Sequence, residues 1–466
     1  MLSGSGVLET RAKMGCRALF APAVLAVSLA PIPAMAQSAN VLYDFVDIAG
    51  STNSGDHPYS GLIADKSGNF YGTTENGGSY GYGTVFELSP PPKSAGKNAP
   101  WVETTLYNFT DYGDGGVPAA SLVFDKSGNL YGTTSQGGDP NALDGEFVGT
   151  VFKLSPAATP GTSWTETTLY AFTGLTDGSD PLGGVIFDKT GNLYGTASEG
   201  GDDTCGAVPG PVGAPVGCGV VYKLSPPVGG TNGPWTESIL WTFEGENAAT
   251  PDGQTPSGTL VFDKKRQYLY GTTQSGGAMD FGMVYKLRPR TKKLGASELD
   301  IYDFQGGNLT SGNGDGETPL SGVIINKAGD LFGTAYGGGA NNLGMVFELT
   351  PGGYQSQWNE TDIFDFNTAN GGGPVGNVTF HGQDLIGATA GSGKTAGEFG
   401  TVYELTPDSS GNYAQTVLYS FAGGTTGSFP TGKLVIRKGA IYGTSLYGGQ
   451  DTTRALGWGT VYRILP

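Results

Sequence analysis

The chain has 466 residues, of which 82 are glycine, 11% are aromatic and 14% are charged, and its formal net charge is −17. The aromatic content is sufficient for a hydrophobic core, which excludes a disordered glycine-rich polymer. Because so acidic a surface repels phosphate backbones and anionic lipid headgroups, we expect no nucleic-acid partner and no attraction to a membrane surface.

Residues 1–36 have the pattern of a secretory signal peptide. Basic residues precede an apolar run, "ALFAPAVLAVSLAPIPAMA", which ends in the A-x-A cleavage pattern Ala34-Met35-Ala36. A membrane anchor is the alternative, but prolines interrupt the run, and no second apolar stretch of about 20 residues follows. We therefore expect a secreted or periplasmic monomer without a membrane span, whose single domain covers residues 37–466.

Short patterns recur in a fixed order along the rest of the chain. The segment "SLVFDKSGNLYGTT" at 121–134 is typical of a strand, a polar turn and a second strand, and strand-like "GTVFKL" and "LYAF" segments follow it. The third pattern occurs seven times, about 63 residues apart, beginning at Gly83, Gly149, Gly219, Gly282, Gly344, Gly400 and Gly459. Four antiparallel strands in each of seven units predict an all-β fold, a seven-bladed β-propeller.

The phase of the repeat predicts how the ring closes. The chain ends after the third strand of its last unit, and "VLYDF" at 41–45 is an isolated fourth-strand pattern. We expect this N-terminal strand to complete the seventh blade, because closure would remove an exposed strand edge. A linear solenoid would not need complementary half-units at its two ends.

A calcium site is one interpretation of the loops that precede the first strand of each unit. These loops repeat Asp-Gly-x-x-Pro, with the aspartates at Asp114, Asp177, Asp252 and Asp315. In the fifth unit Asn313, Asp315 and Glu317 alternate as oxygen ligands of calcium could. The interpretation that we favour is a turn, in which aspartate accepts backbone hydrogen bonds and glycine supplies a positive φ. The sixth and seventh units, "GGGP" and "GSFP", lack the aspartate, so we expect no obligatory cofactor and leave calcium as the alternative.

Cys205 and Cys218 are the two cysteines that follow the predicted signal peptide. Both lie in one Gly/Pro-rich loop. A disulfide would close that loop and stabilise the protein by roughly 3 kcal/mol. A two-cysteine metal site is the alternative, but no histidine or further cysteine lies nearby to complete it.

Two motif matches are explained by the repeat. The sixth unit contains "ATAGSGKT", which approaches a nucleotide-binding loop, but there a strand replaces the helix that such a loop requires. The first unit contains "GGSYG", which approaches a nucleophile elbow. That motif needs a strand-to-helix turn and a partner histidine, and only His57 and His381 are present.

Binding is expected on the face that carries the loops of most variable length, those before the first strand and between the second and third strands. Exposed aromatic side chains there could contact an extracellular glycan or a protein partner. The candidates in these loops are Trp458, Tyr447, Tyr80, Tyr82 and Tyr336. The sequence does not indicate catalysis, but a polysaccharide hydrolase or lyase that uses paired carboxylates on this face is the alternative. A passive envelope protein is a third interpretation.

The unit "GNLYGTT..GG....GTVFKL" resembles the Gloeobacter–Verrucomicrobia tandem repeat of exported bacterial proteins. The resemblance extends from about Val41 to Pro466 and is weakest in the sixth unit, at "DLIGATAGSG". It implies export and a repeat architecture. It implies no activity and no functional residues.

Overall fold

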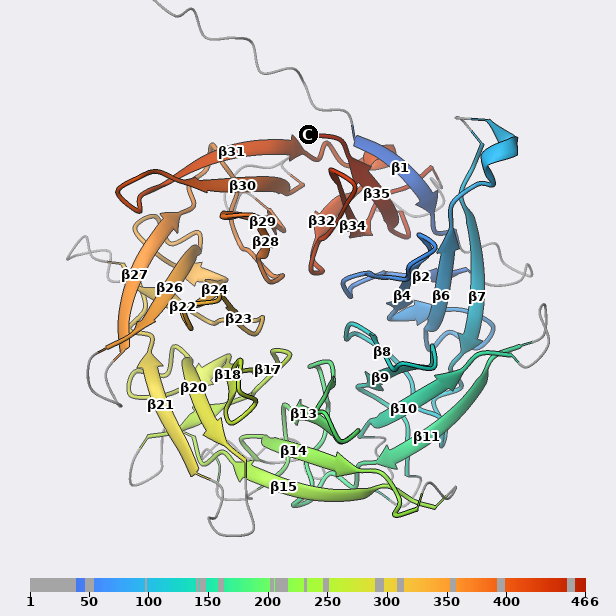
Figure 1. Cartoon of the computed structure of the whole chain (residues 1–466), viewed down its shortest axis with the longest axis horizontal. Coiled ribbons are helices and arrows are strands. Elements are labelled where there is room, and N and C mark those ends of the chain that lie inside the picture. The colour runs from blue at the N-terminus through green and yellow to red at the C-terminus, as the bar shows by residue number, and fades with distance from the viewer. Residues whose placement is uncertain are drawn as a thin grey trace, which may run out of the picture. The chain divides into compact units, whose positions relative to one another are not determined.

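Seven antiparallel blades, each with four strands, are arranged in a ring around a central channel, and the prediction of a seven-bladed β-propeller is confirmed (Figure 1). The sheet of the seventh blade has a fifth strand, β32 (Ser428–Pro430), which pairs with β34 (Ala440–Tyr447). The computed structural model describes residues 39–46, 54–96, 99–139, 142, 148–157, 163–201, 205, 217–229, 233–245, 251–289, 297–307, 314–352, 358–391, 399–450 and 457–466. The chain divides into Met1–Ala36 and Gln37–Pro466, and every described residue belongs to the second unit. The predicted signal peptide lies outside the described residues. Among those residues, no helix is long and apolar enough to cross a membrane.

Each blade runs from a short inner strand to a long outer strand. The inner strands are β3 (Ile63–Ala64), β8 (Val123–Phe124), β12 (Ile186–Phe187), β17 (Val261–Phe262), β23 (Ile324–Ile325), β28 (Thr379–His381) and β33 (Val435–Arg437). The second strands are β4 (Phe70–Thr74), β9 (Leu130–Thr134), β13 (Leu193–Ala197), β18 (Leu269–Thr273), β24 (Leu331–Ala335), β29 (Asp384–Thr389) and β34 (Ala440–Tyr447). The third strands are β6 (Thr84–Ser89), β10 (Thr150–Ser155), β14 (Val220–Ser225), β20 (Met283–Arg288), β26 (Met345–Pro351), β30 (Thr401–Pro407) and β35 (Thr460–Ile464). The outer strands are β7 (Val102–Asn108), β11 (Thr165–Ala171), β15 (Thr236–Thr242), β21 (Ser297–Asp303), β27 (Trp358–Asp365), β31 (Tyr413–Ser420) and, for the seventh blade, β1 (Ala39–Asp44).

The strand β1 closes the ring. It pairs antiparallel with β35, with Ala39 opposite Ile464 and Asp44 opposite Thr460. Phe45, directly after β1, is fully buried and packs against Phe86 of the first blade, with ring centroids 5.2 Å apart. The N-terminal strand therefore completes the last blade, as the phase of the repeat predicts.

Alternation along the third strands builds the core between blades. In β6, Val85 packs in a cluster with Leu122 and Leu130 of the second blade. Its neighbour Phe86 points to the other side, into a cluster with Val461 of the seventh blade. A β-strand directs successive side chains to opposite faces, so one "TVFEL" segment holds two neighbouring blades together.

Consecutive blades are joined on one face by a glycine and a proline. Gly83, at the start of the "GTVFEL" segment, has φ +91°, and a Cβ there would lie 2.7 Å from Cδ of Pro118 in the next blade. The residue before that proline, Val117, has φ +53° and donates its N–H to the Tyr82 carbonyl at 2.9 Å. Equivalent bonds to the preceding blade are donated by His57, Asp180, Thr255, Thr318, Gly373 and Phe429. The joint explains why these glycines and prolines repeat.

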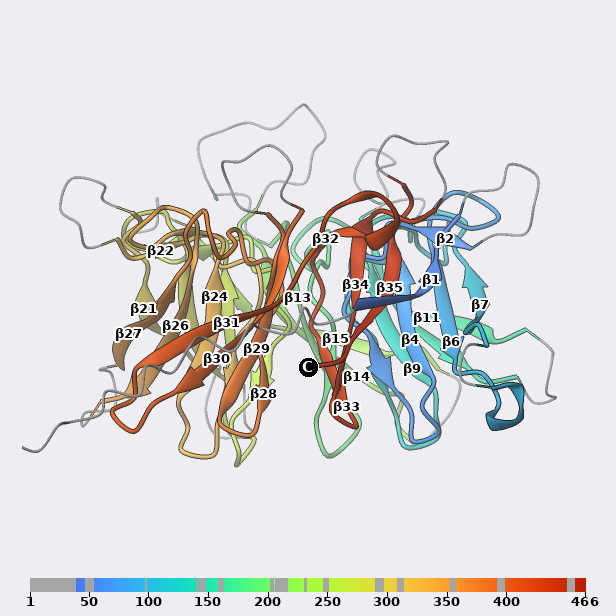
Figure 2. The same ribbon diagram turned by 90° about the horizontal axis from the view of Figure 1, so that it is seen from above.

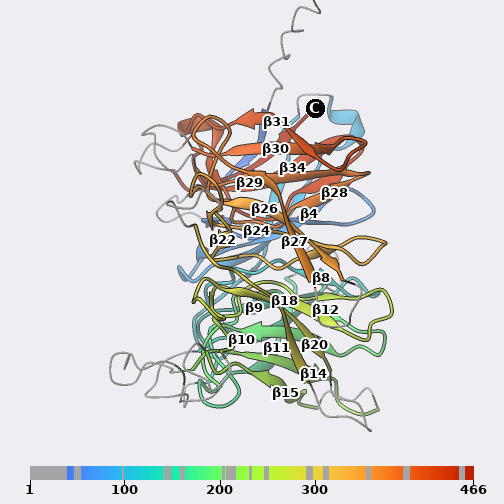
Figure 3. The same cartoon turned by 90° about the vertical axis from the view of Figure 1, so that its left-hand side faces the viewer.

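The loops before the first strand and after the second strand lie on the same face, which we call the loop face. Short ladders join them, between β2 (Gly55–Asp56) and β5 (Asn76–Gly77), β16 (Gly253–Gln254) and β19 (Ser275–Gly276), and β22 (Gly316–Glu317) and β25 (Gly337–Gly338). Figure 2 shows β2, β22 and β32 (Ser428–Pro430) along one edge of the ring. Figure 3 shows β22 toward this face and β12 and β28 toward the opposite rim.

Candidate functional site

The aspartates of the repeated loops are hydrogen-bond acceptors within a turn. Asp114 accepts the backbone N–H of Thr110 at 3.0 Å and the Tyr107 hydroxyl at 2.9 Å. The equivalent acceptors of a backbone N–H in the other six loops are Ser54, Asp177, Asp252, Asp315, Asn370 and Thr426. Serine, asparagine and threonine thus take the same place as aspartate. The turn accounts for the motif without a cation.

The structure describes only part of the alternative ligand set of the fifth unit, and it shows a cluster of carboxylates around Asp315. Asn313 lies outside the described residues, and Glu317 lies on β22. Asp315 lies beside Glu360 and Asp362 of β27, and one ligand atom of each is within 4.8 Å of the other two. Burial is the main cause that raises the pKa of the Glu360 carboxyl. The hydrogen bond with Asp362 and the negative charge of Asp362 raise it further. The cluster can share a proton or attract a cation. The sequence analysis missed it because β27 begins more than 40 residues after Asp315.

Cys205 and Cys218 form a disulfide, and both are buried. They pack in a core cluster with Phe243 and Leu260. The bond therefore anchors the base of the loop between β13 and β14 in the hydrophobic core.

A groove of about 440 Å³ lies on the loop face at the junction of the seventh and first blades. We call it the junction groove, and its lining residues are Asp56, His57, Asn76, Gly77, Gly78, Gly81 and Trp458. The blade joint fixes His57, because it donates its N–H to the Trp458 carbonyl at 2.9 Å and accepts the N–H of Glu75 at 3.1 Å. The ladder of β2 and β5 sets Asp56 opposite Asn76.

Three polar side chains that line this groove lie close together. Asp56 Oδ1 lies 2.8 Å from His57 Nδ1, and Asn76 Nδ2 lies 3.5 Å from the same nitrogen. Burial raises the pKa of the neighbouring Glu75 carboxyl to about 7. The charge of His57 acts in the opposite direction, and that of Asp56 adds to the rise. A carboxyl poised near neutrality beside an Asp–His pair can donate or accept a proton at physiological pH.

The aromatic residues singled out in the sequence are distributed unevenly around this groove. Gly81 of the groove lies between Tyr80 and Tyr82, which are 61% and 38% exposed. The Tyr447 ring contacts His57 edge-on, with centroids 5.3 Å apart. Trp458 lines the groove but is only 7% exposed, so its ring offers little surface to a ligand. Tyr336, 46% exposed, belongs to the fifth blade and does not line the groove.

The central channel contains a charged group that the sequence analysis missed. The channel has a volume of about 360 Å³, and Lys433 is the one charged residue among the described residues that line it. Burial within the channel wall lowers the pKa of its ammonium group. Tyr59 also lines this channel, and burial and the charge of Glu75 raise its pKa to about 12. Lys433 lies three residues after Pro430, the loop proline of the seventh unit. The residues at the same position in the first six units are Gly61, Ser121, Gly184, Thr259, Gly322 and Asn377.

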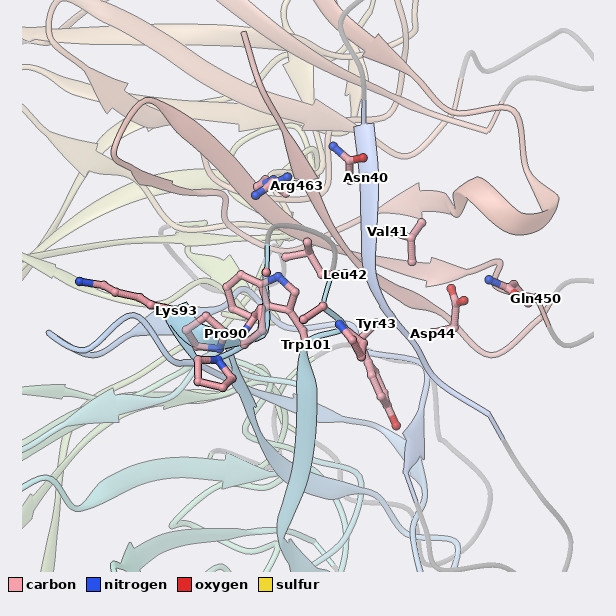
Figure 4. Close-up of a pocket in the computed structure, with 15 residues that line it drawn as sticks. Asn40, Val41, Leu42, Tyr43, Asp44, Pro90, Lys93, Trp101, Gln450 and Arg463 are labelled. Carbon is pink, nitrogen blue, oxygen red and sulfur yellow. The ribbon is translucent and has the colours of Figure 1, made fainter.

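A larger cavity of about 960 Å³ lies at the outer edge, where the closing strand meets the first blade (Figure 4). Leu42 and Tyr43 of β1 line it together with Trp101, Pro90 and Arg463. Leu42, Tyr43 and Trp101 also pack against the core cluster of this blade junction. The cavity contains none of the predicted ligand contacts, and its walls serve ring closure.

The repeat itself identifies the family. The pattern of the Gloeobacter/Verrucomicrobia repeat matches residues 32–209 and 308–466. The chain belongs to this family. The resemblance found in the sequence is thereby confirmed.

Solved structures resemble this Gloeobacter/Verrucomicrobia repeat protein only at low identity and with TM-scores below 0.5. The PQQ-bound aldose sugar dehydrogenase of Streptomyces coelicolor is 12% identical, with a TM-score of 0.41, and the match covers 92% of this chain and 98% of that one. A glucose dehydrogenase is 11% identical, with a TM-score of 0.40, over 92% of this chain and 99% of that one. Neither similarity carries an argument about function. No curated protein matches the chain.

Proposed function

We propose that this repeat protein is an exported binding module and that the junction groove on its loop face holds an extracellular glycan. The observation that carries the proposal is the combination in one groove of hydrogen-bonding side chains with exposed tyrosines beside them. Asp56, His57 and Asn76 line the groove, and Tyr80 and Tyr82 flank its Gly81. Export rests on the signal peptide predicted at 1–36.

A sugar requires both kinds of contact. Its hydroxyl groups donate and accept hydrogen bonds, which carboxylate, imidazole and amide groups provide in both directions. Its C–H faces stack on aromatic rings, and an exposed tyrosine provides apolar surface with a polar end. A volume of about 440 Å³ lies in the range of small-ligand sites. The blade joint also holds His57 in place before any ligand arrives, which lowers the entropic cost of binding.

The test is binding of the purified protein to a panel of soluble and insoluble polysaccharides, measured by pull-down. We expect Tyr82→Ala and Asn76→Ala each to weaken binding about tenfold, equivalent to about 1.4 kcal/mol. Tyr336→Ala removes an exposed tyrosine from the same face but outside the groove, so it is the matched control. Equal losses in all three variants, or none, would place the binding surface elsewhere.

The hydrolase or lyase alternative is favoured by the place of Glu75, which directly precedes Asn76 of the groove and whose burial raises the pKa of its carboxyl. A carboxyl with a pKa of about 7 beside the Asp56 carboxylate suits general acid catalysis. The same incubations therefore include an assay for released reducing ends and for unsaturated products. Release that Glu75→Gln abolishes would replace the binding module with an enzyme.

Calcium and the other partner classes are separated by the same experiment. Because the loop aspartates act within their turns, we expect glycan binding to be equal with calcium and with a chelator. Loss of binding under chelator would restore the calcium interpretation. Binding to no polysaccharide would favour a protein partner or a passive role in the envelope.

A further inference from the structure

The sixth blade has a different turn at the rim opposite the loop face. In the second blade, Asp125 at this turn accepts the N–H groups of Ser127 and Asn129 at 2.8 and 2.9 Å. In the sixth blade the turn is shorter, and His381 at the end of β28 lies directly opposite Asp384 at the start of β29. A histidine and a carboxylate thus replace a self-contained polar turn.

A second carboxylate joins them from the next strand. Ile386 of β29 lies opposite Glu404 of β30. Because Asp384 and Ile386 are two residues apart, Asp384 and Glu404 lie on the same face of the sheet, as does His381. One ligand atom from each of the three side chains lies within 4.8 Å of the other two.

The distance between His381 and Glu404 suits two ligands of one metal ion. Nδ1 of His381 lies 3.5 Å from Oε1 of Glu404, which is long for a hydrogen bond. Two ligand atoms bound to zinc at 2.0–2.1 Å with tetrahedral angles are about 3.4 Å apart. The side chain of His381 is 47% exposed and that of Glu404 23%, so an ion can reach both from solvent.

In blades two to four a lysine occupies the position equivalent to Glu404, whereas the first and fifth blades have Glu87 and Glu348 there. The lysines are Lys153, Lys223 and Lys286. Each of these ammonium groups lies about 6 Å from the ring centroid of the tyrosine opposite it in the second strand. In the sixth blade Ile386 takes the place of this tyrosine, and Glu404 takes the place of the lysine. Within the described part of the chain, the one ion pair of Glu404 is with His381.

We propose that His381, Asp384 and Glu404 bind a divalent transition-metal ion of the zinc type. One imidazole nitrogen and two carboxylates are ligands that Zn²⁺ accepts, whereas Ca²⁺ and Mg²⁺ take oxygen ligands. Three protein ligands leave the fourth position for water. The strands β28, β29 and β30 hold the ligands on one hydrogen-bonded sheet.

The test is titration of the metal-free protein with Zn²⁺ by isothermal calorimetry, with Mg²⁺ as the comparison ion. We expect one Zn²⁺ per chain and no measurable heat with Mg²⁺. His381→Ala and Glu404→Gln should each weaken Zn²⁺ binding about tenfold or more. Glu348→Gln changes the equivalent glutamate of the fifth blade, which has no histidine at its turn, and should leave binding unchanged.

A spectroscopic readout identifies the ligands independently of affinity. Co²⁺ added in place of Zn²⁺ should give visible absorption bands of a low-coordinate site, and His381→Ala should remove them. Absence of stoichiometric binding would overturn the proposal. So would Zn²⁺ binding that persists in both His381→Ala and Glu404→Gln, because the ion would then lie elsewhere, for example at His57.

Discussion

The glycine of each blade joint lies where there is no room for a side chain. Gly282 has φ +87°, and a Cβ there would lie 2.7 Å from Cδ of Pro319. Gly128 has a nearly equal φ of +85°, but a Cβ there would meet nothing within 4 Å. We expect Gly128→Ala to cost about 1 kcal/mol through backbone strain alone, and Gly282→Ala to cost roughly 3 kcal/mol because a clash is added. Urea denaturation of the two variants measures the difference. Equal losses would show that the joint tolerates the methyl group.

The role of the loop aspartates at this same scale could be predicted only in part. The sequence favours a turn over a calcium site, and the hydrogen bonds of Asp114 and Asp177 account for such a turn. The sequence analysis missed that Ser54 and Thr426 take the same place, although Gly-x-x-Pro follows each of them, because it looked for aspartate at the first position. Several residue types can accept the same backbone hydrogen bond, whereas a search for a sequence pattern finds only the residue type that it specifies.

At the scale of elements, the closing strand is where stability can be tested most directly. Removal of residues 1–46 would delete β1 and the fully buried Phe45, which exposes the edge of β35 and opens the core beside Phe86. We expect a large fall in melting temperature and aggregation. A synthetic peptide of residues 39–46, added in trans, should restore part of the loss.

Deletion of residues 1–36 is the matched control, because β1 begins at Ala39. The melting temperature should then equal that of the full chain. If the longer deletion also melted at the same temperature, the ring would not depend on β1 for closure.

The strands themselves were the best-predicted elements, and the small ladders were missed. Alternation in "TVFEL" predicts a strand that packs on both sides, and β6 covers Thr84–Ser89 with that pattern of burial. The ladder of β2 and β5 joins two-residue segments rich in glycine, which have no hydrophobic period to detect. These ladders place Asp56 beside Asn76, so the junction groove depends on elements that the sequence does not reveal.

At the scale of the whole molecule, the groove also depends on ring closure. His57 and Trp458 are hydrogen-bonded across the junction although they lie at opposite ends of the chain. The sequence predicts that the last blade is completed by the first strand, and therefore that the two ends meet. It does not reveal the register that sets His57 against the Trp458 carbonyl, at the place where Pro58 lies against Gly459.

Stability of the whole propeller should fall as pH rises from 5 to 8. Burial raises the pKa of Glu75, Glu103, Glu166 and Glu237 to about 7, and it also raises that of Glu360. The unfolded chain loses these protons near pH 4.5, so between about 4.5 and 7 the folded state binds more protons than the unfolded state. The stability that the protonated carboxyls contribute is complete below that window and is lost as pH passes through 7. Melting temperatures measured at constant ionic strength should therefore decrease in the order pH 5, 6, 7 and 8.

Glu166→Gln should flatten the decrease, because it removes one of these titrating carboxyls. The sixth blade already has a neutral residue, Gln415, at the equivalent position. A melting temperature that rises over this range would mean that the carboxyls are ionised and satisfied in the folded state, and that the blade junctions hold them by hydrogen bonds such as that from Tyr43 to Glu103.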